Sequence, residues 1–279
     1  MKPQSLAFCL ASVAAVAAAA AAIAGLAMSG LYRDAPNWAQ QARGTDLATL
    51  FLVVPILIFG SWGTSRGSQV GRLAVVGGLF YLAYNYAIFA FSVAMNPLTV
   101  LYIAILGLAM WSLGLAARDE SIAAAGLAVA QSLNARISAG LLMGFAGLFG
   151  LLWLSQVTMA AITGVLPPDV QRAGIVTNPV YALDLALFLP LCAVAGVGLA
   201  RHSRGAALAY PMLIWVALTS ASIIGGLGLA ALANEHVPAL VIALVTAPGI
   251  AAAILAVAPL LRRRIARETL LVPLGPQPQ

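Results

Sequence analysis

The sequence predicts an all-α protein, a polytopic membrane helical bundle of eight transmembrane helices arranged as two parallel four-helix repeats. Three observations lead to this prediction: an apolar composition, eight apolar runs of membrane-crossing length, and a pair of motifs that recurs at a fixed distance. Hydrophobic residues make up 62% and charged residues 8% of the 279 positions. A water-soluble domain needs more polar surface than this chain can supply.

Each apolar run holds about 20 residues, the length that an α-helix needs to cross the hydrocarbon layer. Transmembrane β-strands alternate over about ten residues, so unbroken runs favour helices. The first run, of about 24 residues, exceeds the usual core of a signal peptide, and we expect it to be retained as a helix. The predicted helices cover residues 5–28, 47–64, 73–95, 97–117, 138–164, 180–200, 209–233 and 238–260.

The two halves of the chain share motifs that lie 138 positions apart. Asp46-Leu47-Ala48 returns as Asp184-Leu185-Ala186, and Ser65-Arg66-Gly67 returns as Ser203-Arg204-Gly205. Seven of the 22 positions in this ungapped window are identical. Self-similarity at a fixed period indicates a duplication. The predicted units are therefore a first four-helix repeat (1–117), a cytoplasmic linker (118–137), a second repeat (138–261) and a basic, then proline-rich tail (262–279).

The distribution of Lys and Arg predicts the orientation, because cytoplasmic loops carry the excess of positive charge. A cytoplasmic N-terminus places eleven basic residues inside and three outside. We therefore expect a protein of the bacterial inner membrane with both termini in the cytoplasm. Four helices per half then make the repeats parallel. The pI near 9.8 reflects this topology, and we expect no nucleic-acid partner. The inner set is Lys2, Arg66, Arg72, Arg118, Arg136, Arg201, Arg204, Arg262, Arg263, Arg264 and Arg267, and the outer set is Arg33, Arg43 and Arg172.

The linker and the tail carry their own expectations. Apolar residues such as Ile122, Val129 and Leu133 among alanines suggest a short amphipathic helix at the membrane surface, although a plain linker fits equally well. Three prolines within residues 270–279 predict a disordered end.

Asp46 and Asp184 are the acidic residues near predicted membrane spans. Each lies 21 residues before the Gly of its Ser-Arg-Gly motif, roughly 30 Å at about 1.5 Å per helical residue, which places it at the outer boundary. Thr45 and Asn178-Pro179 have the character of helix starts. Two hypotheses stay open: the carboxylates stabilise helix N-termini, or they form a paired outward-facing ligand or cation site.

Polar side chains cluster near the centre of the predicted helix 73–95. Tyr81, Tyr84 and Asn85 lie where headgroup anchoring cannot explain them, and Tyr81 and Asn85 share one helical face. Either they hydrogen-bond to neighbouring helices, or they line a mid-membrane cavity. Further polar residues could complete either arrangement: Thr219 and Ser222, which align with Tyr81 and Tyr84, and Gln156.

The chain lacks the residues that several functional classes require. The histidines, His202 and His236, both lie at predicted membrane edges, so intramembrane haem ligation and His-rich zinc sites are disfavoured. The sequence has a single lysine, Lys2, and its position at the N-terminus excludes a lysine Schiff base inside the bundle. We therefore expect no metal and no cofactor.

Four segments resemble the first half of a family of uncharacterised multi-pass membrane proteins from bacteria. They are Leu31-Tyr32-Arg33-Asp34, Arg43-Gly44-Thr45-Asp46-Leu47, Tyr84-Asn85-Tyr86 and Asn96-Pro97-Leu98, and the resemblance covers about a third of the chain. It implies a membrane fold and no particular activity.

The leading hypothesis is an integral membrane protein that binds or transports a small, lipophilic or weakly polar molecule through a cavity between the repeats. Its candidate ligand-binding residues are Tyr81, Tyr84, Asn85, Asp46, Asp184, Thr219, Ser222 and Gln156. The alternative is a non-catalytic accessory or scaffold subunit of a larger membrane complex. A third hypothesis, an intramembrane enzyme, would use Asp46 with Arg43 or Asp34 at the outer surface.

Overall fold

The computed structural model describes the backbone of residues 3–271 and the side chains of residues 6–261. This part of the chain is helical and holds no strand. Its elements are α1 (Pro3–Ala27), α2 (Pro36–Ala48), η1 (Thr49–Val53), α3 (Val54–Ser65), α4 (Gln69–Ser92), α5 (Thr99–Ala117), α6 (Glu120–Ala130), α7 (Ala135–Thr163), α8 (Pro168–Ala173), α9 (Pro179–Leu183), η2 (Asp184–Phe188), α10 (Leu189–Ala200), η3 (Arg204–Leu208), α11 (Ala209–Leu232) and α12 (Ala239–Leu271).

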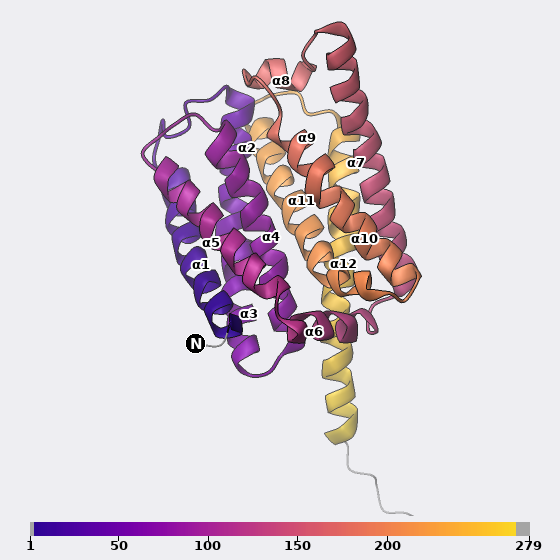
Figure 1. Cartoon of the computed structure of the whole chain (residues 1–279). Helices are drawn as coiled ribbons and strands as arrows, with labels where there is room; N and C mark the ends of the chain where they lie inside the picture. The colour runs from indigo at the N-terminus through magenta and orange to yellow at the C-terminus, as the bar shows by residue number, and fades with distance from the viewer. Residues whose placement is uncertain (1–2, 272–279) are drawn as a thin grey trace, which may run out of the picture.

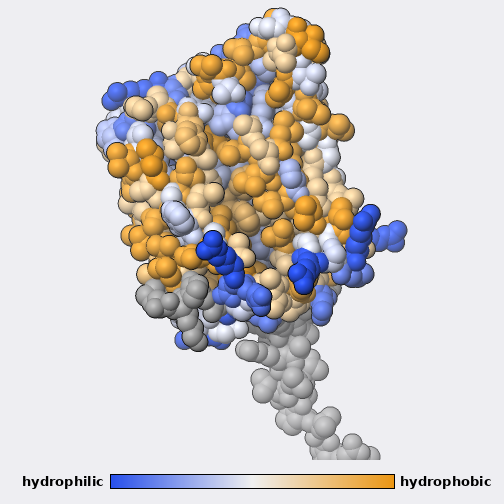
Figure 2. All heavy atoms as spheres, viewed as in Figure 1, coloured by the Kyte–Doolittle hydropathy of each residue, from blue (hydrophilic) through white to orange (hydrophobic). Residues whose placement is uncertain are grey.

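Eight helical stretches are long and apolar enough to cross a membrane, as the sequence predicts. They are α1, α2–η1–α3, α4, α5, α7, α9–η2–α10, η3–α11 and α12. The surface is consistent with membrane insertion: on the face shown in Figure 2, hydrophobic residues cover the middle and hydrophilic residues gather toward the two ends. The chain is therefore an integral membrane protein.

Two predicted boundaries were wrong. The second stretch begins at Pro36 rather than at residue 47, since the polar residues of α2 hide the start of the helix from a hydropathy count. Thr45 thus lies inside a helix and does not start one. The last helix continues to Leu271, which contradicts disorder at residues 270 and 271; the rest of the predicted disordered end lies outside the described residues.

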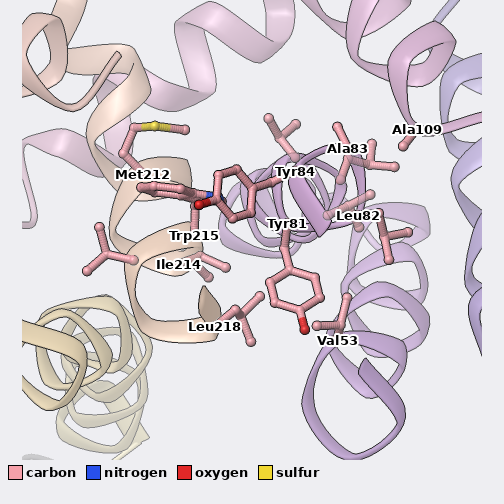
Figure 3. Close-up of a cluster of buried hydrophobic side chains, with 14 of the residues drawn as sticks. Val53, Tyr81, Leu82, Ala83, Tyr84, Ala109, Met212, Ile214, Trp215 and Leu218 are labelled. Atoms are coloured by element: carbon pink, nitrogen blue, oxygen red, sulfur yellow. The ribbon is translucent and has the colours of Figure 1, made fainter. Parts of the chain in front are cut away.

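The central pair of helices is α4 and α11, which pack against each other across the middle of the bundle (Figure 1). In the most apolar window of α4, 78% of residues are buried, against 17% for α7. Aromatic rings fill the contact between the central helices: Tyr84 of α4 meets Trp215 of α11 edge to face at 5.4 Å. Figure 3 shows these rings side by side. The core therefore lies between α4 and α11, and α7 lies at the periphery.

A π-helical turn interrupts the second and the sixth stretch at related places. In η1 the N–H of Val54 bonds to the carbonyl of Thr49, five residues back, and Pro55 follows. In η2 the N–H of Leu189 bonds to Asp184 in the same way, and Pro190 follows. Proline lacks an N–H and crowds the preceding turn, which favours a local widening of the helix at this position.

These turns lie 135 residues apart, whereas the sequence motifs lie 138 apart. The helices after them, α3 and α10, both have 12 residues, and a left-handed residue closes each hairpin: Gly67 with φ 78° and His202 with φ 51°. Gly205, which aligns with Gly67 by sequence, lies instead in η3. Identical residues at the 138 spacing therefore do not occupy equivalent positions in the two hairpins.

The linker between the halves contains the short helix α6, so the helical interpretation of this segment is confirmed. Asp119 begins it by accepting a hydrogen bond from the N–H of Ser121 at 2.8 Å, a usual N-cap contact. Ile122 and Val129 are buried on the side that packs against α4 and η3. Figure 1 shows α6 at the same end of the bundle as the start of α1 and the end of α12.

Candidate functional site

A cavity of about 490 Å³ lies among α2, α4, α7, α9, α11 and α12. Its wall is mostly apolar and aromatic and includes Trp38, Phe89, Phe149, Trp153 and Tyr181. The volume falls within the usual range for small-molecule sites, which combine apolar walls with a few convergent polar groups. Uncharged polar residues of the wall include Thr45, Asn85, Gln156, Thr219 and Ser222.

Asn85 and Thr219 line this cavity from the two central helices. Asn85 is 5% exposed, and its Nδ2 donates to the Tyr81 carbonyl at 3.2 Å, which holds the amide along α4. Thr219 is 7% exposed, and within the described structure its Oγ1 has no hydrogen-bond partner. An unpaired buried hydroxyl costs free energy unless water or a ligand satisfies it. Because protein atoms enclose this oxygen, water or a ligand would reach it only after neighbouring side chains shift.

The α2 side of the cavity is joined to α11 by polar contacts. Thr45 Oγ1 and Ser222 Oγ share a hydrogen bond of 2.8 Å, and Gln41 Nε2 donates to the Ser222 carbonyl at 3.3 Å. Glycines Gly44 and Gly226 let the two backbones approach closely at this place. Ser222 thus has a structural partner and still lines the cavity.

One end of the cavity is formed by α8 and the start of α9, at the end of the bundle opposite α6 (Figure 1). Asn178 is the N-cap of α9 and accepts a hydrogen bond from the N–H of Val180, so the predicted helix start at Asn178-Pro179 is confirmed. Asp169 of α8 accepts hydrogen bonds from Asn178 Nδ2 at 2.9 Å and from the Tyr181 hydroxyl at 2.8 Å. Arg172 of α8 also lines this end. The charged side chains that line the cavity therefore gather at its α8 end.

Asp184 lies directly behind the cavity wall and does not line it. Trp153 Nε1 donates to its Oδ2 at 2.8 Å, and Tyr84 interacts with it from α4. Both Trp153 and Tyr84 line the cavity. In the described structure Oδ1 of Asp184 is buried and unpartnered. Asp184 also opens the π-helical turn η2, and such turns are frequent at functional sites.

Asp46 lies apart from the cavity, in the contact between α2 and the end of α1. The Tyr32 hydroxyl donates to its Oδ2 at 2.6 Å, and Gly25 of α1 packs against the same pair. Burial and the neighbouring Asp46 carboxylate raise the pKa of Tyr32, so the phenol stays a hydrogen-bond donor. Asp46 is the eleventh residue of α2 and does not cap a helix.

The remaining predicted site residue, Tyr81, is fully buried and also lies away from the cavity. Its hydroxyl donates to the Thr45 carbonyl at 3.2 Å and lies 3.3 Å from Thr49 Oγ1. Tyr81 therefore joins α4 to the second stretch. The structure brings together five of the predicted residues at the cavity, Tyr84, Asn85, Gln156, Thr219 and Ser222, and leaves Tyr81, Asp46 and Asp184 outside its wall.

Sequence reasoning missed the aromatic part of the wall. Phe149, Trp153 and Gln156 are spaced by four and three residues, so they share one face of α7, and this pattern could have identified them. Trp38, on α2, had no comparable signal because its helix was not predicted. Among the described residues, no group of three or more His, Cys, Asp or Glu side chains could hold a metal ion.

Comparison with known protein families, with curated proteins and with solved structures gave no significant match.

Proposed function

We propose that this chain is a binding or transport protein of a bacterial cytoplasmic membrane, and that its cavity takes a small, lipophilic or weakly polar molecule. The observation that carries the proposal is the cavity itself, an apolar and aromatic enclosure of about 490 Å³ whose wall also holds the uncharged polar side chains of Asn85 and Gln156. Uncharged polar groups in an apolar, aromatic enclosure suit a ligand that needs few hydrogen bonds.

We further propose that both termini are cytoplasmic and that the halves are parallel repeats. The end of the bundle that holds α6 also carries Arg66, Arg118, Arg136 and Arg201, which supports a cytoplasmic position by the positive-inside rule. The recurring π-helical turn, proline and 12-residue helix support a duplication. An even number of stretches in each half makes such repeats parallel.

The experiment starts with native mass spectrometry of the protein purified in mild detergent, which identifies any retained small molecule or subunit. Thermal unfolding is then measured with and without the retained molecule for the wild type, Asn85→Leu and Thr219→Val. Both substitutions remove a hydrogen-bonding group from the cavity while keeping its approximate volume. We expect the ligand-induced rise in melting temperature to be lost or strongly reduced in both variants.

Tyr81→Phe is the matched control, because it removes a buried hydroxyl of α4 that does not line the cavity. We expect it to lower the melting temperature and to leave the ligand-induced rise unchanged. Equal ligand-induced rises in the wild type, Asn85→Leu and Thr219→Val would contradict the cavity proposal. A retained protein subunit in place of a small molecule would favour the accessory-subunit alternative.

A further inference from the structure

A groove between α7 and α12 lies next to the cavity. This groove has a volume of about 410 Å³, and Phe149 and Leu244 line both spaces. Its floor on α7 includes Gly140 and Gly144, and a Cβ added to either would meet no other described atom within 4 Å. Since α7 is the least covered of the eight stretches, the groove faces the surrounding bilayer.

The groove and the cavity differ in chemistry. All the residues that line the groove are Gly, Ala, Leu, Phe or Pro, so it offers no side-chain hydrogen bond and matches a hydrocarbon chain. Pro248 also lines it, and because proline has no N–H, the carbonyl of Leu244 one turn earlier loses its usual helical partner. The helix α12 is therefore weakened where the groove meets the cavity.

The cavity, in contrast, offers hydrogen bonds but little charge. Among its described lining residues the charged ones are Asp169 and Arg172, both on α8 at one end of the cavity. A charged head group placed beside Asn85 and Thr219 would lose its hydration without an opposite charge in the wall, which is costly inside a membrane. An uncharged, hydrogen-bonding group meets no such penalty.

We propose that the ligand is an uncharged membrane lipid that enters sideways between α7 and α12, with its head group in the cavity and its hydrocarbon chain in the groove. Gly140 and Phe149 are nine residues apart, so the groove follows α7 for roughly 14 Å at about 1.5 Å per residue. The inference rests on the proposed function and adds the ligand class and the route to it.

The test compares three probes with the same two eight-carbon chains and different head groups: dioctanoylglycerol, dioctanoylphosphatidylcholine and dioctanoylphosphatidylglycerol. Native mass spectrometry in detergent measures the concentration at which half of the protein carries each probe. We expect dioctanoylglycerol to bind at a concentration at least about tenfold below that of either phospholipid, since a few misplaced groups in a site change affinity by this order.

Leucine substitutions then separate the groove from the rest of the surface. Gly144→Leu places a side chain in the groove without a clash, so the protein should still fold. We expect it to raise the half-binding concentration of dioctanoylglycerol about tenfold or more. Gly107→Leu on α5 is the matched control. A Cβ added there also meets no described atom within 4 Å, and Gly107 does not line the groove. We expect no change for the control.

The outcomes distinguish the two proposals. If Asn85→Leu loses dioctanoylglycerol while Gly144→Leu binds it like the wild type, the cavity proposal stands and the sideways route is overturned. If neither variant changes binding, both are overturned. Tighter binding of dioctanoylphosphatidylglycerol would overturn the uncharged head group. A dimer that Gly144→Leu abolishes, with glyceride binding unchanged, would show a second copy of the chain in the groove instead.

Discussion

The close contact between α2 and α11 predicts that a single added methyl group at Gly44 destabilises the protein. A Cβ on Gly44 would lie 2.5 Å from the Cα of Gly226 and 2.8 Å from the carbonyl carbon of Gly225. Ordinary carbon contacts are about 3.5 to 4.0 Å, so the helices would have to separate by about 1 Å. Both atoms belong to the backbone, which cannot rotate away as a side chain can.

The expected free energy follows from two opposing effects. Adding a methyl group to a well-packed contact costs about 1 to 3 kcal/mol of unfolding free energy. Because the atoms in contact belong to the rigid backbone, we expect Gly44→Ala to cost about 3 kcal/mol. Alanine gains up to about 1 kcal/mol over glycine in a helix, which leaves a net loss of about 2 kcal/mol. Gly147→Ala is the matched control, because its Cβ would meet no described atom within 4 Å; it should gain up to about 1 kcal/mol.

Reversible unfolding in mixed micelles, followed by circular dichroism during titration with sodium dodecyl sulfate, measures both variants. We expect their unfolding free energies to differ by about 3 kcal/mol, the sum of the net loss and the gain. Equal stability of Gly44→Ala and Gly147→Ala would refute the close approach of α2 and α11 and, with it, the position of the cavity wall that α2 supplies.

Two further predictions concern the Tyr32–Asp46 pair and the topology. Tyr32→Phe should lower the unfolding free energy by about 1 to 2 kcal/mol through loss of the buried hydrogen bond, while ligand binding stays at the wild-type level; altered binding would show that the pair acts on the cavity. A double-mutant cycle with Asp46→Ala, which removes the acceptor, checks that both changes remove one shared interaction. Reporter fusions should place Arg66, Arg136 and Arg204 in the cytoplasm and Asn37, Asp169 and Glu235 outside, and one reversed site would break the parallel arrangement.

The number of membrane-crossing helices could be predicted because the hydrocarbon layer imposes one length and one composition on each. The start of α2 could not, because Gln40, Gln41 and Arg43 lower the hydropathy of a segment that is nevertheless helical and partly buried. Pro36 at the first helical turn was the available signal, since proline is favoured there. Burial against α11, which no local pattern reveals, keeps these polar residues in the helix.

The candidate site was only partly predictable for a related reason. Helical spacing shows that Tyr81 and Asn85 share a face of α4, and Asn85 does bond to the Tyr81 carbonyl. Helical spacing does not show which neighbouring helix each side chain contacts. Tyr81 reaches Thr45 and Thr49, whereas Asn85 reaches the cavity. The partner of Asp184, Trp153, lies on another helix 31 residues away, and only the packing of α7 against α10 brings the two together.

The ungapped comparison of the halves also misled in one respect. Asp46 and Asp184 align at the 138 spacing, but the π-helical turns and their prolines align at 135. Asp184 therefore opens a π-helical turn, whereas Asp46 lies three residues before one. The two carboxylates have different partners, Trp153 and Tyr32, because they occupy different positions relative to the turn. Their identity in sequence was no evidence for a shared role.

Comparison of the two central helices gives a physical reason for a cavity on one side of the bundle. Both α4 and α11 have 24 residues, but α11 carries Gly225 and Gly226 at its contact with α2, whereas α4 carries Tyr84 and Asn85 at the cavity. The glycines let α2 lie directly on α11. The larger side chains of α4 line the cavity together with Val180 and Tyr181 of α9. In the proposed duplication, this difference in side-chain size between the two central helices would turn one of two related helix contacts into a binding site.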